Sequence, residues 1–149
     1  MRTLSTYYRR IIDDRSHKAP VFNKKLKGWF AEQGWSFTWQ PQDFDKVARQ
    51  TAYLLINKIL FYNLLQAKRP GELDPLEIPA GLTKGARLQS YLQGYFNEIL
   101  KIDYDTIYTT DFIDEIAFPD APEVVTEVKE FINNIKGASC KNHKDYRSA

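Results

Sequence analysis

The chain has 149 residues, enough for one ordinary domain, and its 43% hydrophobic, 14% aromatic and 27% charged residues exclude global disorder. Its net charge of +2 is unevenly distributed: residues 1–30 hold eight Lys or Arg against two Asp, whereas residues 101–130 hold two Lys against nine Asp or Glu. The single cysteine, Cys140, excludes an intramolecular disulfide framework, and the N-terminus is not typical of a signal peptide. We therefore expect a cytoplasmic protein with one core.

Two amphipathic helices are predicted at the start of the chain. Apolar residues at three- and four-residue spacing predict a short first helix around residues 4–12 and a second helix over residues 20–33, ended by Gly34. The inward positions are Leu4, Tyr7, Tyr8, Ile11, Ile12, Val21, Phe22, Leu26, Trp29 and Phe30. Aromatic and polar residues then alternate over residues 35–40, through Trp35, Phe37 and Trp39. A lone short strand has no partner, so this segment is predicted to be an extended aromatic connector.

The longest predicted helix covers residues 43–68 and follows Pro41. From Tyr53 to Leu65 its only polar residues are Asn57, Lys58 and Asn63, so the helix is predicted to be central and buried on nearly every side. The apolar run is too short and interrupted to span a bilayer, which needs about 20 apolar residues. No membrane is expected as a partner.

The remaining elements complete an all-α fold. Three prolines and two glycines predict a loop over residues 70–82, and apolar spacing predicts a core helix over residues 83–100. Short helical turns are expected within residues 103–116, with Asp105 and Asp111 as caps. A capping-box-like pair, Asp120 and Glu123, precedes a last helix that Gly137 should end. We predict a single domain of about five helices over residues 1–137, with basic helices at 1–34, a core at 42–137 and a disordered tail at 138–149.

The sequence shows no recognisable catalytic or metal-binding motif. The glycines never take the spacing of a phosphate-binding loop. Cys140, His17 and His143 are too few for a zinc or iron site, and two of them lie in the predicted tail. The acidic residues lack the spacing of a calcium loop and are expected to cap helices or face solvent. They are Asp103, Asp105, Asp111, Asp114, Glu115 and Asp120. No cofactor is expected in this chain.

The basic N-terminal segment is the strongest functional signal. Its cations lie among Tyr7, Tyr8, Trp29 and Phe30, a combination that suits phosphate contact with occasional base stacking. The predicted DNA-binding residues are Arg9, Arg10, Arg15, Lys24, Lys25 and Lys27. The alternative is that these residues form the solvated faces of two amphipathic helices, because a chain of net charge +2 lacks the strongly basic character of an autonomous DNA-binding protein.

Three segments carry a resemblance to a known family. They are ARQTAYLLINKILFYNLLQ, LQSYLQGYFNEILKIDYDTIYTTDFIDEIAFPD and EVVTEVKEFINNIKG. The pairs Asn57-Lys58 and Phe61-Tyr62 and the later Asp-Phe-Ile-Asp-Glu-Ile segment are the distinctive parts. Residues 42–137 resemble the helical N-terminal region of N6-adenine DNA methyltransferases of restriction-modification and phage-defence systems.

The resemblance implies a non-catalytic role. In that family the helical region precedes an α/β domain that binds S-adenosylmethionine, and neither the [ND]PP[YFW] motif nor the glycine-rich cofactor motif occurs in this sequence. No catalytic or cofactor-binding residue can therefore be carried over. We expect a truncated or split helical module that contacts DNA or docks to a methyltransferase catalytic domain or another subunit. The alternative is a protein-interaction or structural module without a nucleic-acid role, for which the aromatic connector would supply an apolar patch. An independent enzyme has the least support.

Overall fold

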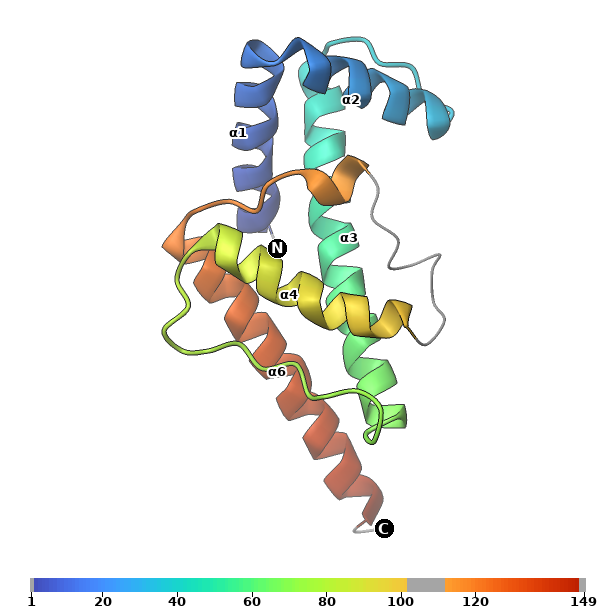
Figure 1. The fold of residues 1–149 in the computed structure, drawn as a ribbon, viewed down its shortest axis with the longest axis vertical. Helices are drawn as coiled ribbons and strands as arrows, with labels where there is room; N and C mark the ends of the chain where they lie inside the picture. The colour runs from blue at the N-terminus through green and yellow to red at the C-terminus, as the bar shows by residue number, and fades with distance from the viewer. Residues whose placement is uncertain (1, 102–111, 148–149) are drawn as a thin grey trace.

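The computed structural model describes residues 2–101 and 112–147, and for Arg2, Glu115 and residues 137–147 it describes the backbone only. These ranges form five α-helices and a short 3-10 helix, η1, and contain no strand, so the all-α prediction is confirmed (Figure 1). The helices are α1 (Arg2–Lys18), α2 (Pro20–Glu32), α3 (Pro41–Lys68), α4 (Gly85–Leu100) and α6 (Pro122–Arg147), and η1 covers Phe112–Glu115. None of the helices in the described ranges has both the length and the apolar content needed to cross a membrane.

Helices α1 and α3 form an antiparallel pair that runs along the molecule (Figure 1). Leu4, Tyr8 and Ile12 lie one helical turn apart along α1 and are all buried. Two small residues on α3, Ala48 and Ala52, are also buried and allow the helix backbones to approach closely. The first predicted helix is thus longer than its apolar stripe indicated, because the polar residues 13–18 continue it as far as Lys18.

Helix α2 and the connector 35–40 close one end of this pair. Gly34, with φ +78°, ends α2 as predicted, because a glycine adopts this left-handed conformation without a Cβ clash. The Trp35 ring centre lies 5.7 Å from that of Trp29 and the Phe37 ring centre 5.0 Å from that of Phe30. Trp35 and Phe37 are therefore half-buried against the core. Of the three aromatic residues in the connector, only Trp39 is exposed. The connector is not a strand, as predicted, and Trp39 is the exposed part of the aromatic surface that was expected to form an apolar patch.

Helix α3 contacts α1, α4, α6 and η1. The prediction that it is buried on nearly every side is nevertheless wrong. Tyr53, Leu60 and Leu64 are 54%, 38% and 58% exposed. The apolar sequence of α3 correctly predicted a helix, but hydrophobic spacing does not reveal how many neighbours are present to cover it.

Two predicted helix boundaries differ from the structure. The N–H groups of Val124 and Val125 donate to the Ala121 carbonyl oxygen, so α6 begins after Ala121, and Asp120 is not part of a capping box. At its other end α6 continues through Gly137, which a helix tolerates at a cost of about 1 kcal/mol. The expected turns and caps at residues 103–111 lie outside the described residues. The boundary between a domain over 1–137 and a tail over 138–149 stays a prediction.

The start of α4 is held against the segment before α6. The Gly85 N–H donates to Asp120 Oδ1 over 3.1 Å, so this carboxylate satisfies an N-terminal donor of α4. A Cβ placed on Gly85 would lie 2.2 Å from the carbonyl oxygen of Pro119. Glycine is therefore required here by close approach of two backbone segments. A Cβ placed on Gly94, further along α4, would meet no atom within 4 Å, so this glycine faces open space.

We predict that Gly85→Ala lowers the free energy of unfolding by about 1–3 kcal/mol, because the added methyl group must push the Pro119 backbone away. Gly94→Ala is the matched control in the same helix, and it should raise the free energy of unfolding by up to about 1 kcal/mol through helix propensity. Urea denaturation of both variants measures the two effects. Equal changes in the two variants would contradict the close approach at Gly85.

Candidate functional site

Arg9, the first of the predicted DNA-binding residues, is bound within the protein. Its Nε lies 3.0 Å from Asp13 Oδ1, and its Nη1 donates to Asp45 Oδ1 and, over 2.8 Å, to the Pro41 carbonyl oxygen. Its guanidinium carbon also lies 5.3 Å from the centre of the Phe44 ring. Arg9 therefore joins α1 to the start of α3, and two carboxylates already neutralise its charge.

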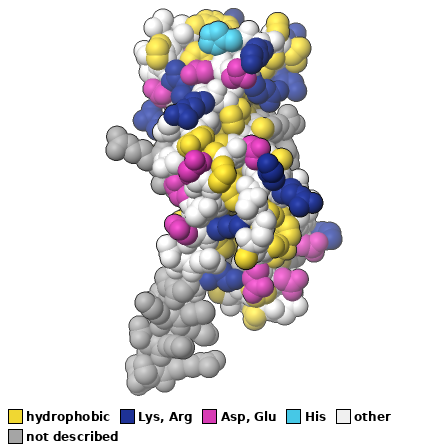
Figure 2. Space-filling view, turned by 90° about the vertical axis from the view of Figure 1, so that its left-hand side faces the viewer, with side chains coloured by type: hydrophobic (Ala, Val, Ile, Leu, Met, Phe, Trp, Pro, Cys, Tyr) yellow, Lys and Arg dark blue, Asp and Glu magenta, His cyan; other side chains and the backbone are white. Residues whose placement is uncertain are grey.

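The other predicted DNA-binding residues, Arg10, Arg15, Lys24, Lys25 and Lys27, are exposed on α1 and α2, and we call them the α1–α2 cations. Figure 2 shows Lys and Arg side chains over the upper part of the molecule, mixed with acidic and hydrophobic side chains. The surface is therefore basic in patches rather than uniformly so. Lys18, also in this region, pairs with Asp14 over 2.8 Å.

Two of the α1–α2 cations converge on one hollow. Arg15, near the end of α1, and Lys25, on α2, both line a hollow of about 110 Å³. Its other lining residues are Ala19, Val21, Phe22, Phe112 and Ile116. The Arg15 guanidinium carbon lies 4.8 Å from the centre of the Phe22 ring, which holds the cation at the edge of the hollow.

The hollow lies where α1 ends and α2 begins, so the partial negative charge of the α1 C-terminus offsets the partial positive charge of the α2 N-terminus. Ala19 occupies the N-cap position and provides no side-chain hydrogen bond to the first turn. The N-terminal end of a helix carries a partial positive charge from its unpaired N–H groups. The two side-chain cations, Arg15 and Lys25, are therefore what makes this hollow suit an anionic group such as a phosphate.

The aromatic residues expected to stack on bases do not accompany these cations at the surface. Tyr8, Trp29 and Phe30 are 3%, 5% and 1% exposed and belong to the core. Tyr7 is half-buried, and its ring centre lies 5.0 Å from the Arg10 guanidinium carbon. The inward positions predicted for Tyr8, Trp29 and Phe30 from their helical spacing are therefore confirmed, and these rings are not available to stack on bases.

The structure describes the side chains of two of the acidic residues that were expected to cap helices or face solvent: Asp120 is exposed and caps the start of α4, whereas Asp114 lies in the core. Asp114 Oδ1 lies 2.6 Å from Lys58 Nζ, and their side chains are only 11% and 4% exposed. Asp120 binds the first turn of α4. Asp103, Asp105 and Asp111 and the side chain of Glu115 lie outside the described residues. The described residues contain no group of three or more potential metal ligands, and the side chains of Cys140 and His143 lie outside them.

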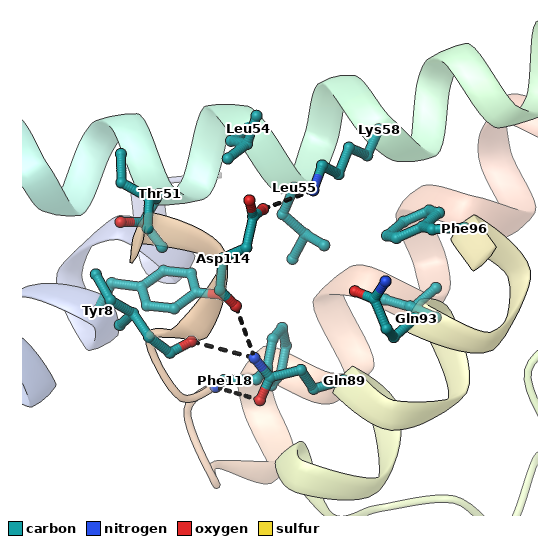
Figure 3. Close-up of a pocket in the computed structure, with 13 residues that line it drawn as sticks. Tyr8, Thr51, Leu54, Leu55, Lys58, Gln89, Gln93, Phe96, Asp114 and Phe118 are labelled. Atoms are coloured by element: carbon teal, nitrogen blue, oxygen red, sulfur yellow. Dashed lines mark hydrogen bonds and ion pairs between the residues drawn. The ribbon is translucent and has the colours of Figure 1, made fainter. Parts of the chain in front are cut away.

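The Lys58–Asp114 pair is part of a polar cluster inside the helical core (Figure 3). Gln89 on α4 donates its Nε2 to the carbonyl oxygens of Asp114 and Ile116, over 3.4 and 3.2 Å. Its Oε1 accepts the N–H of Phe118 over 3.1 Å. One glutamine side chain thus binds the backbone on both sides of the turn that follows η1. This satisfies polar groups that burial would otherwise leave without partners.

A cavity of about 50 Å³ lies beside this cluster, and Tyr8, Thr51, Gln93 and Phe96 are among the residues lining it. Burial and the nearby Asp114 carboxylate raise the pKa of Tyr8 above its ordinary value. The cavity is much smaller than the roughly 300–1,000 Å³ of typical small-molecule sites. Its size and lining suit a few ordered waters.

Comparisons of this chain with protein-family models, with curated proteins and with solved structures found no match. The site must therefore be interpreted from its own residues. The sequence contained one signal for the buried cluster, the lysine within the apolar run of α3. A buried lysine needs a carboxylate partner, but the sequence does not say which of the later acids supplies it.

We predict that Asp114→Leu lowers the free energy of unfolding by about 3–5 kcal/mol, because it leaves the buried Lys58 ammonium without its carboxylate. The double variant K58M/D114L should be more stable than D114L alone, since it removes both charges. Urea denaturation of the single and double variants gives the coupling energy.

The exposed pair Lys101–Glu98, with side chains 71% and 56% exposed, is the matched control. Its double-mutant cycle should give a coupling energy of about 0–1 kcal/mol. A coupling energy for Lys58 and Asp114 no larger than this control would contradict a buried, desolvated ion pair.

Proposed function

We propose that this chain is a helical module that contacts the phosphate backbone of DNA through the α1–α2 cations. The observation that carries the proposal is the convergence of Arg15 and Lys25 on one hollow at the start of α2. Cations that two helices contribute to one hollow favour an oxyanion over a merely solvated face. The resemblance of residues 42–137 supports the same proposal and gives the module its context, an N6-adenine DNA methyltransferase of the restriction-modification type.

The proposed binding is independent of DNA sequence. Phosphate contacts position a protein on the duplex but do not read bases. Three of the four rings considered for base stacking, Tyr8, Trp29 and Phe30, are in the core, so the α1–α2 cations act mainly on the backbone. Such binding weakens steeply with salt, because each phosphate contact releases bound counterions.

The proposed module does not itself perform methylation. The sequence contains neither the catalytic nor the cofactor motif of the family it resembles. S-adenosylmethionine would belong to a catalytic domain in a separate chain or segment. This chain would contribute DNA contact to such a domain.

We predict that R15E/K25E weakens binding to duplex DNA and makes the slope of log affinity against log salt shallower by about 2, one for each lost phosphate contact. Fluorescence anisotropy with a labelled duplex, repeated over a range of salt concentrations, measures both quantities. A duplex of unrelated sequence should give the same result, because no base is read.

The control is K84E/R87E, which changes the net charge equally at two exposed residues of the α4 region. Its salt slope should stay within about 1 of the wild-type value. Two outcomes would contradict the proposal: no salt-dependent binding by the wild-type chain at low ionic strength, or an equal loss in the two double variants.

A further inference from the structure

The outward face of α3 carries an apolar stripe. Tyr53, Leu60 and Leu64 are 54%, 38% and 58% exposed, and Asn57 lies exposed between them. Positions 53, 57, 60 and 64 are separated by four, three and four residues, so they lie on one face of the helix. We call these four residues the α3 outer stripe. It extends for about 16 Å along the helix axis.

The α3 outer stripe has a cation at each end. Arg49 lies one turn before Tyr53, and Lys68 lies one turn after Leu64. Both side chains are exposed, and neither forms a salt bridge with another described residue. The stripe is therefore a mostly apolar surface, interrupted by Asn57, with a cation beyond each end.

This charge arrangement is unsuited to pairing with a second copy of the chain. If two copies met antiparallel about the midpoint of the stripe, Arg49 of one copy would face Lys68 of the other. If they met parallel, each cation would face its own equivalent. Like charges that face each other across two helices are destabilising, so both arrangements place repulsion at the two ends.

We propose that the α3 outer stripe binds an amphipathic helix of a different protein, one with an apolar stripe flanked at both ends by Asp or Glu. Helices recognise such partners through apolar residues at three- and four-residue spacing, and flanking charges select the partner and its register. Tyr53 supplies a large, rigid contact surface of the kind that dominates binding energy at interfaces. The proposal does not depend on the proposed DNA contact, which uses other residues.

Two synthetic helical peptides test the proposal. Both carry leucines at helical spacing; one has glutamates at its two ends, and the other has lysines there instead. Fluorescence anisotropy should show that the acid-flanked peptide binds the wild-type chain roughly tenfold more tightly than the base-flanked peptide. The variant R49E/K68E should reverse this preference, because both flanking charges change sign.

The variant L60D/L64D should abolish binding of both peptides. Its matched control is W39D/Y91D, which changes two exposed apolar residues outside the stripe and should retain binding. Circular dichroism confirms that each variant keeps its helical content. A variant that loses its fold is replaced by L60S/L64S, for which the expected loss of binding is the same.

Several outcomes would overturn the proposal. Equal affinity for the two peptides would show that the flanking cations do not select a partner. Peptide binding that is unchanged in L60D/L64D would show that the binding site lies outside the α3 outer stripe. Self-association in sedimentation that L60D/L64D removes would assign the stripe to a second copy. The stripe would instead bind a membrane surface if the wild-type chain bound anionic lipid vesicles but neither peptide, and if L60D/L64D abolished the vesicle binding.

Discussion

The ion pair between Lys58 and Asp114 is the contact on which the arrangement of the later elements depends. It joins α3 to η1 across 56 positions in the sequence, with both side chains removed from solvent. Such a pair adds little net free energy, because desolvation of the two charges offsets their attraction. Displacing η1, however, would leave a buried lysine without its carboxylate. The penalty for that separation, rather than a large net gain, fixes the position of η1.

The position of η1 connects the core to the basic surface. Its first residue, Phe112, packs on Phe22 of α2 with ring centres 5.5 Å apart, and Phe112 and Ile116 line the hollow shared by Arg15 and Lys25. Gln89 of α4 holds the turn after η1 through three hydrogen bonds. The buried polar cluster and the proposed phosphate site are therefore parts of one arrangement: α3 and α4 place η1, and η1 completes the hollow.

Local signals in the sequence predicted the helices, whereas pairing across the fold could not be predicted. Pro41 and Gly34 mark boundaries because their backbone preferences act within a few residues. The partner of Lys58 depends on tertiary packing, and so does the neutralisation of Arg9 by Asp45, a residue on another helix. The outer stripe of α3 was missed for a related reason. An apolar run predicts a helix that needs covering, but not how much of it this chain covers.

In the proposed division of the surface, DNA contacts the α1–α2 cations while the α3 outer stripe stays available to a protein. A titration of the isotopically labelled chain with duplex DNA, followed by amide chemical shifts in NMR spectra, tests this division most directly. At low salt, the largest shifts should fall at the end of α1 and along α2, including residues around Arg15 and Lys25, and they should diminish as salt is added. Shifts centred on residues 53–64 of α3, or no shifts at low salt, would contradict it.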